Sequence, residues 1–177
     1  FGVLIALLVT SPGWQTFQET FFDLAYAREV FGGILSAFKT DLVILFFSTI
    51  LISVLAMALA LLRTTRAAAS APFRILSTGY VDLFRGIPLL LVLYLVGFGI
   101  PALQISWLPT STMLWGTVAI SLTYAAYVAE VIRSGILSIH PSQRAAARAL
   151  GLTQGQTMRH VVLPQALRRV VPPLLND

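Results

Sequence analysis

The 177-residue sequence contains no cysteine. Disulfide bonds and metal sites built on thiolates are therefore excluded. The two histidines, His140 and His160, are twenty positions apart and have no acidic neighbour along the chain, so we interpret them as ordinary interfacial residues and not as metal ligands. The sequence also has no Walker sequence, no nucleophile triad and no paired acid and base. We therefore do not expect it to be an enzyme or to hydrolyse ATP itself.

Charged residues are scarce. They make up 11% of the chain, against about 25% in an average soluble domain, whereas apolar residues make up 57% and the mean hydropathy is +0.85. This balance predicts an integral membrane protein. A net charge of +5 would suit a nucleic-acid partner, but long uncharged runs separate the arginines, so no basic groove and no nucleic acid are expected. The positive-inside bias of cytoplasmic loops explains the basic excess better.

Long runs without charge predict the membrane spans. Residues 42–62 form one such run of 21 residues, and a helix that rises about 1.5 Å per residue crosses a bilayer core of about 30 Å over that length. We therefore predict a span over about 42–63. The 44 uncharged residues 86–129 suit two spans, and two prolines with a Ser/Thr cluster predict a break at 101–112. We place these spans at about 78–100 and 113–136, which makes the fold an all-α, polytopic helical bundle.

Arginine positions predict the orientation of the spans. They gather in the connection between the first two spans and in the segment after the third, so both of these segments should be cytoplasmic. The stretches 11–41 and 101–112 should then lie outside. The arginines are Arg63, Arg66, Arg74 and Arg85 in the first group, and Arg133, Arg144, Arg148, Arg159, Arg168 and Arg169 in the second.

The two ends of the chain are expected to be parts of further spans. Residues 1–10 look like the outer half of an apolar helix. A signal-peptide core is the alternative, but no basic segment precedes it and no small-residue cleavage site follows closely. We assign residues 1–34 to the end of an extra N-terminal span with an outer loop. Residues 165–177 turn apolar again and are expected to begin another span, so that the membrane domain 35–177 would be incomplete at its C-terminus.

The segment 137–164 is polar and basic, and it is predicted to form two short helices. The first starts at Pro141 and ends at Leu150, with Gly151 as a left-handed cap. The second starts at Thr153, where Gln156 completes a capping box, and stops before Pro164. Two interpretations remain open on these residues alone. The segment is either an amphipathic surface element held by anionic lipid or a docking element for a cytoplasmic partner.

A residue pattern in this segment resembles a known family. The stretch AAARALGLTQGQTMRHVVLPQAL (145–167) resembles the EAA loop of binding-protein-dependent ABC permeases, which reads E-A-A, a glycine after three residues and I-x-L-P after nine more. Six residues fall at the required spacings: Ala146, Ala147, Gly151, Val161, Leu163 and Pro164. The family glutamate is replaced by Ala145, which also removes a possible capping box with Ser142.

Further segments resemble the polar amino-acid branch of the same family. These are YVDLFRGIPLLLVLYLVGFGIP (80–101), AYVAEVIRSGILSIHPSQ (126–143) and VLPQALRRVVPPLLND (162–177). The resemblance implies the transmembrane domain of a type I ABC importer in the bacterial inner membrane, surrounded by lipid. It implies three protein partners: an ABC ATPase subunit inside, a solute-binding protein outside and a second permease copy or homologue. It implies no cofactor on this chain, because ATP and Mg are used by the partner subunit.

The resemblance also implies which residues couple the permease to the ATPase. The EAA loop, here 137–164, would sit in a cleft of that subunit. The expected coupling residues are Arg144, Ala145, Ala146, Ala147, Arg148, Leu150, Gly151, Leu163 and Pro164.

Three features outside this loop each allow two interpretations. Arg85, Gly86 and Pro88 either shape the inner end of a translocation path or only start a helix. Glu130 and Arg133, three apart, form either a structural ion pair or part of a gate. A set of small residues either packs helices closely or contacts ligand. Its members are Gly97, Gly99, Gly116, Ser121 and Thr123.

The predicted function is therefore a permease subunit that forms the membrane path for a polar amino acid. One alternative is a permease for another small solute, such as an opine, a sulfonate or a sugar. The other is a non-transporting membrane anchor that uses 137–164 to hold a soluble partner.

Overall fold

The computed structural model describes residues 1–65 and 68–175, and every element within these ranges is helical. The prediction for Arg66 and the last two positions of the expected span 165–177 lie outside the described residues. The chain divides into two units, residues 1–43 and 44–177. The helix α3 (Leu24–Thr64) contributes its first part to one unit and its second part to the other.

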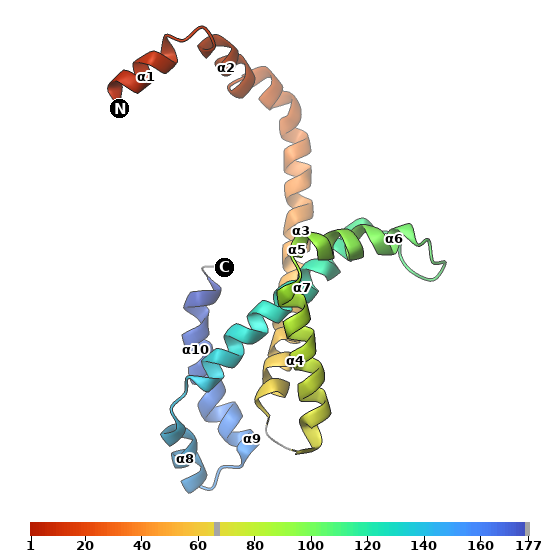
Figure 1. The fold of residues 1–177 in the computed structure, drawn as a ribbon, viewed down its shortest axis with the longest axis vertical. Coiled ribbons are helices and arrows are strands. Elements are labelled where there is room, and N and C mark those ends of the chain that lie inside the picture. Colours follow the sequence, from red (N-terminus) through yellow and green to blue (C-terminus); the bar gives the residue numbers. More distant parts are fainter. Residues whose placement is uncertain (66–67, 176–177) are drawn as a thin grey trace. The chain divides into compact units, whose positions relative to one another are not determined.

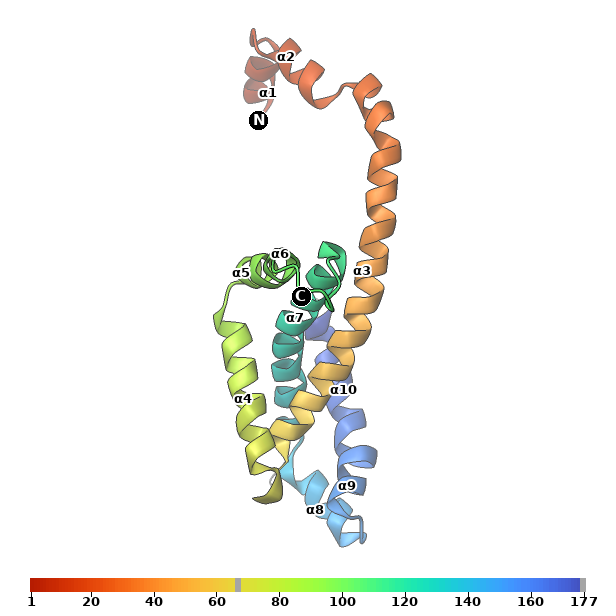
Figure 2. The same cartoon turned by 90° about the vertical axis from the view of Figure 1, so that its right-hand side faces the viewer.

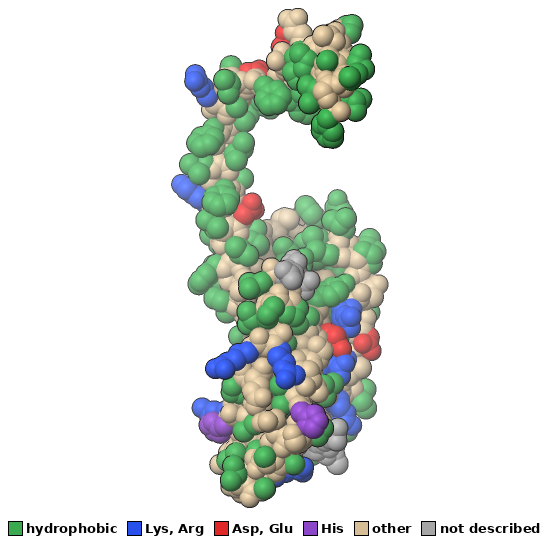
Figure 3. All heavy atoms as spheres, turned by 90° about the vertical axis from the view of Figure 1, so that its left-hand side faces the viewer, with side chains coloured by type: hydrophobic (Ala, Val, Ile, Leu, Met, Phe, Trp, Pro, Cys, Tyr) green, Lys and Arg blue, Asp and Glu red, His purple; other side chains and the backbone are tan. Residues whose placement is uncertain are grey.

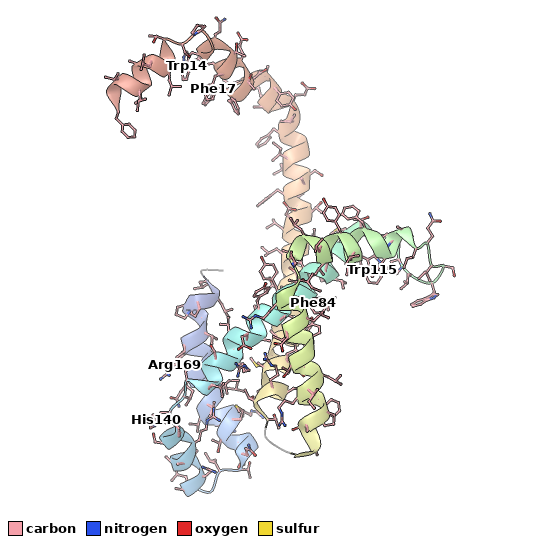
Figure 4. The ribbon with its side chains drawn as sticks, in the orientation of Figure 1. Trp14, Phe17, Phe84, Trp115, His140 and Arg169 are labelled. Atoms are coloured by element: carbon pink, nitrogen blue, oxygen red, sulfur yellow. The ribbon has the colours of Figure 1, made fainter. Side chains whose placement is uncertain are left out.

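The unit 1–43 contains α1 (Gly2–Val9), α2 (Trp14–Phe21) and the beginning of α3. Phe17 lies at the centre of a small aromatic cluster, with its ring 5.4 Å from that of Trp14 and 4.8 Å from that of Phe21 (Figure 4). Asp23 begins α3, because its Oδ1 accepts hydrogen bonds of 2.8 and 3.0 Å from two N–H groups of the first turn. A side-chain oxygen in this place satisfies donors that have no partner within the helix.

The helix α3 is longer than the span expected over 42–63. It has 41 residues and starts at Leu24, so residues 24–41 continue the same helix and are not an irregular outer loop. This stretch contains no proline, and its charged side chains are exposed, so they are compatible with a helix. The uncharged residues from 42 onward remain the part that suits a bilayer.

In the unit 44–177, α7 (Thr112–Leu137) is the central helix (Figures 1 and 2). It lies where the span 113–136 was expected, and it packs against α4 (Ala71–Gly86) and α10 (Leu163–Leu174). Five of the twelve buried core residues are alanines, whose small side chains allow close approach of the backbones. The buried core consists of Ala56, Leu59, Ala60, Val81, Ala126, Ala129, Ile132, Ile136, Ile139, Val162, Ala166 and Val170.

The contact between α7 and α10 depends on a glycine. A Cβ atom added at Gly135 would overlap Cγ1 of Val170 and would lie 3.3 Å from the carbonyl oxygen of Ala166. Only a residue without a side chain therefore allows the two helices to meet at this distance.

The single span expected over 78–100 is broken in the structure. Helix α4 ends at Gly86, and a new helical stretch starts at Leu89 and runs to Ala102, bent by 104° from α4. Ile87 is extended (φ −98°, ψ 130°) and Pro88 is the N-cap of the new helix. A proline disfavours helical geometry in the residue before it, so an additional break, not predicted from the sequence, falls at Pro88. The predicted break at 101–112 is also present, because the helical stretch ends at Ala102 and α7 begins at Thr112.

Two other prolines do not stop helices as predicted. The stretch after Pro88 consists of α5 (Leu89–Val92), the π-helix η2 (Leu93–Gly99) and α6 (Ile100–Ala102), which contains Pro101. Pro164 likewise lies inside α10, two residues after the π-helix η3 (Met158–Val162).

The π turns explain why these prolines are tolerated. In an α-helix a proline ring collides with the carbonyl group four residues earlier. In η3 the N–H of Leu163 donates instead to Met158, five residues back, and this wider turn moves the carbonyl groups away. The same spacing of two residues separates η2 from Pro101.

Among the residues that the structure describes, two helical stretches are long and apolar enough to cross a membrane, Trp14–Thr64 and Thr112–Leu137. The bent pair Ala71–Gly86 and Leu89–Ala102 makes a third if it counts as one broken span. A short 3₁₀ turn, η1 (Ala68–Ser70), precedes α4. Within the unit 44–177, the connection from α3 to α4 lies at the same end as α8 (Pro141–Ala149) and α9 (Gln154–Thr157) (Figures 1 and 2). Arg63 and Arg74 thus lie at the same end as the segment 137–164, as the orientation argument requires, whereas Arg85 lies in the last turn of α4, at the other end of that helix.

Candidate functional site

The segment 137–164 begins with a helix that is capped by a histidine. His140 is the N-cap of α8, its Nδ1 accepts a 3.2 Å hydrogen bond from the N–H of Ser142, and Pro141 is the first helical residue. The start at Pro141 was predicted correctly. The predicted link between Ser142 and position 145 was wrong, because Ser142 is already inside the helix, and Ala145 therefore costs no capping box.

The turn after α8 is closed by two main-chain hydrogen bonds. The N–H of Gly151 donates to Arg148 (2.9 Å) and the N–H of Leu152 donates to Ala147 (3.1 Å). These bonds define a Schellman motif, which needs a left-handed residue directly after the helix. Gly151 has φ +83°, so its predicted role as a left-handed cap is confirmed. A residue with a Cβ atom would be strained there.

The helix α9 starts with the capping box predicted at Thr153. The Thr153 hydroxyl accepts from the N–H of Gln156 (3.3 Å), and the Gln156 amide oxygen accepts from the N–H of Thr153 (2.9 Å). The turn of four residues between Ala149 and Gln154 is therefore fixed from both sides by backbone geometry.

One face of this segment is attached to the bundle. Ala147 is only 3% exposed. Arg144 donates a 2.8 Å hydrogen bond to the carbonyl group of Ile136 at the end of α7, and Arg169 of α10 donates one of 2.8 Å to Ser138 (Figure 4). Of the predicted coupling residues, Arg144 and Ala147 thus contact the bundle itself. They hold α8 in place and do not offer an outer surface.

The other face of the segment is open. Leu150, at the tip of the turn, is 83% exposed. The other predicted coupling residues divide by burial. Ala145, Ala146, Arg148, Gly151 and Pro164 are exposed, and Leu163 is half-buried. The exposed part of the segment therefore offers an apolar tip, small side chains and one arginine to a partner.

A second group of predicted residues forms an ion cluster on α7. Glu130 accepts from Arg133 at 2.5 Å, so the expected ion pair at a spacing of three is present. Its other carboxylate oxygen binds Arg63 of α3 at 2.6 Å. The Arg63 side chain is only 10% exposed, and it ties α3 to α7. Sequence reasoning missed Arg63 as the partner, although Arg63 ends an apolar run on the same predicted side of the membrane as Glu130.

The helix break at Pro88 is attached to α7 one turn from this cluster. The Tyr127 hydroxyl donates a 3.3 Å hydrogen bond to the carbonyl group of Arg85, and the Arg85 guanidinium lies 5.8 Å from the centre of the Tyr127 ring. Tyr127 and Glu130 are three residues apart and therefore neighbours on α7. The two groups predicted for a path or gate are therefore both connected to α7. Arg85, next to the break at Pro88, contacts Tyr127 of that helix, and Glu130 and Arg133 belong to it.

Gly97 lies at a close contact between two helices of the bundle. A Cβ at Gly97 would lie 3.6 Å from the Cα of Gly116, so the backbones of η2 and α7 are in direct contact. Ser121 is occupied by a 2.7 Å hydrogen bond to Thr117 of its own helix. Thr123 is buried, and its hydroxyl has no hydrogen-bond partner among the residues that the structure describes. No group of three or more His, Asp or Glu side chains that could hold a metal ion occurs within 1–65 and 68–175.

Comparison with known proteins gives consistent matches. Residues 54–177 match the family model described as binding-protein-dependent transport system inner membrane component. The chain is 40% identical over 140 residues to a probable glutamine ABC transporter permease protein, GlnM, of Bacillus subtilis, covering 75% of this chain and 62% of that protein. It is 35% identical over 169 residues to a probable amino-acid ABC transporter permease protein, YckA, of the same organism, covering 96% and 70%.

A solved structure has the same fold. The crystal structure of an amino acid ABC transporter with histidines matches with a TM-score of 0.63 and 32% identity, covering 75% of this chain and 59% of that one. The chain thus spans about three fifths of the length of the glutamine permease and of this solved chain.

Proposed function

Since this chain belongs to the family of binding-protein-dependent transport system inner membrane components, we propose that it is the permease subunit of an ATP-driven importer for a polar amino acid. Its relatives are amino-acid ABC transporter permeases, and the solved structure with the same fold is an amino acid ABC transporter. The bacterial inner membrane is the compartment that this function requires.

The observation that carries this proposal is the outward surface of the segment 137–164. A turn fixed by a Schellman motif and a capping box presents an apolar tip, Leu150, that the chain itself leaves uncovered. An apolar side chain that is removed from water when a partner binds contributes favourably to the binding free energy. The Leu150 side chain is therefore expected to be more stable in a cleft of a cytoplasmic ATPase subunit than in water.

The proposed mechanism is alternating access. Two ATPase subunits, which use ATP and Mg, close and move the segment 137–164 with them, and the spans of two permease copies or homologues rock and open a path outward. A solute-binding protein then releases its cargo into that path. The inner and the outer partner must each favour a different state of the permease, because a partner with equal affinity for both states does not change the equilibrium between them.

The test is the variant Gly151→Asp. A side chain at φ +83° strains the turn and misplaces the tip, whereas the membrane spans are untouched. We expect normal membrane insertion, loss of co-purification with the genomically adjacent ATPase and loss of amino-acid uptake. Gly155→Ala is the matched control, because a Cβ at Gly155 meets no atom within 4 Å. Full uptake by Gly151→Asp would contradict the coupling role.

The orientation has its own test. Gln154 is exposed at the start of α9, so a cysteine placed there should react only with a reagent that crosses the membrane. Modification by an impermeant reagent added to intact cells would place the segment outside and would exclude the importer.

A further inference from the structure

The ion cluster borders a cavity that the proposed coupling does not use. This cavity has a volume of about 480 Å³, which falls within the usual range of small-molecule sites. It lies between the end of α3, α4 and α7. It is lined by Arg63, Arg74, Ile75, Thr78, Gly79, Asp82 and Arg133.

The charges around the cavity are unevenly paired. Glu130, behind the cavity, accepts from both Arg63 and Arg133, and Arg74 donates one hydrogen bond to the carbonyl group of Thr65. A guanidinium has five N–H donors, so each of these arginines has donors left over. Three guanidiniums against the carboxylates of Glu130 and Asp82 leave an excess of one positive charge.

Asp82 is the exposed acidic member of the set. It lines the same cavity as three arginines, yet it forms no ion pair or hydrogen bond with any residue in the described ranges. Acidic and basic side chains of this unit lie close together on one face in Figure 3. The cavity thus offers unused donors on one wall and an unused carboxylate on another.

The wall formed by α4 is shaped for an occupant. Ile75, Thr78, Gly79 and Asp82 follow one another at intervals of three and four residues, so they form one stripe along the helix. A glycine inside a helix costs about 1 kcal/mol relative to alanine, and packing does not require it here, since a Cβ at Gly79 would meet nothing within 4 Å. Its effect is to leave the middle of the wall open.

We propose that this cavity binds a zwitterion: an anionic oxygen group held by the guanidiniums of Arg63, Arg74 and Arg133, and a primary ammonium group held by Asp82. Two sources carry this chemistry at this end of the bundle. One is a free amino acid, with its carboxylate and ammonium. The other is the phosphate and ammonium of an ethanolamine phospholipid headgroup. The site is separate from the coupling surface at Leu150.

The first arm of the test uses a free amino acid. The full chain is placed in nanodiscs of phosphatidylglycerol, which has no amine, and binding of radiolabelled L-glutamine is measured by equilibrium dialysis. Asp82→Asn and Arg74→Gln should each weaken binding about tenfold, the usual effect of losing one hydrogen bond to a charged group. Asp41→Asn and Arg159→Gln, which lie outside the cavity, serve as controls. Glutaramate, which lacks only the ammonium group, should not compete.

The second arm uses the lipid. The chain is reconstituted without amino acid in phosphatidylglycerol with either phosphatidylethanolamine or phosphatidylcholine, and the retained lipid is counted by native mass spectrometry. Retention of the ethanolamine lipid, lost in Asp82→Asn, assigns the site to the headgroup, because the choline group has no N–H to donate. Loss of glutamine binding in Asp82→Asn assigns it to a free amino acid.

The proposal is overturned if Asp82→Asn matches the wild type in both arms. It is also overturned if glutaramate competes as well as glutamine while no ethanolamine lipid is retained. Co-purification with the ATPase is measured in the same variants. If the wild-type chain does not co-purify with the ATPase, the proposed importer is contradicted, whereas the result for the cavity still stands.

Discussion

Replacing Gly135 by alanine tests the packing on which the bundle depends. The added Cβ would overlap Cγ1 of Val170 on α10 and would lie 3.3 Å from the carbonyl oxygen of Ala166. The overlapping atom belongs to a short branched side chain that is 3% exposed, and a stiff, buried group of this kind has no free space to rotate into. The helices α7 and α10 must therefore separate.

The magnitude follows from the two contacts. An extra methyl group in a packed core costs about 1–3 kcal/mol, and we expect the upper half of that range, because a backbone oxygen as well as a side chain is in the way. Val170→Ala alone should cost about 1–2 kcal/mol through lost burial. In the double variant the overlapping Cγ1 atom is gone and the Ala166 oxygen remains, so Gly135→Ala should then cost about 1 kcal/mol.

The assay is reversible unfolding of the purified chain in mixed micelles by increasing fractions of SDS, followed by circular dichroism. The four combinations form a double-mutant cycle, and the expected coupling free energy between the two positions is about 1–2 kcal/mol. Gly155→Ala, whose added Cβ meets no atom within 4 Å, should not lower the midpoint. If Gly135→Ala lowers the free energy of unfolding equally in the wild type and in Val170→Ala, the argument is refuted, because the cost would then not come from this contact.

Three further predictions concern the site. Glu130→Gln should lower the free energy of unfolding by about 2 kcal/mol in the same assay, because two arginines lose a charged acceptor, whereas the exposed Glu29→Gln should change it little. Leu150→Ala should leave stability within about 0.5 kcal/mol, as is usual for an exposed position, yet reduce ATPase capture in pull-downs at least about tenfold. Equal capture would show that the tip is not in the interface. Thr153→Ala should remove about 1 kcal/mol of capping, seen as faster amide exchange in α9 with unchanged exchange in α7; uniform acceleration would contradict a local effect.

Much of the fold could be predicted from residue patterns. The all-α membrane bundle and the family are confirmed, and α7 begins and ends within one residue of the expected helix. The left-handed Gly151 and the capping box at Thr153 were also predicted, because each depends on a few adjacent residues and on local geometry. Predictions from local sequence were therefore reliable where a few adjacent residues determine the backbone conformation.

The errors concern prolines and distant partners. Pro88 breaks a helix, while Pro101 and Pro164 lie within helices. The outcome depends on whether the preceding turn widens to a π-helix, and no single residue type specifies that. The pairing of Arg63 with Glu130 joins positions 67 apart, so it follows from how α3 packs on α7 and not from any spacing along the chain.

The π turn before Pro164 has a mechanical consequence. Because it absorbs the proline, the backbone is helical without a break from Gln154 to Leu174, a length of about 30 Å at roughly 1.5 Å per residue. A helix is stiff along its axis, so a displacement applied at Gln154 should be carried along it as far as Val171, before the two prolines, Pro172 and Pro173, of the last turn. The turn at Gly151, which precedes this helix, is itself held by the Schellman motif and the capping box, so motion imposed on the tip should reach the bundle through one continuous helix.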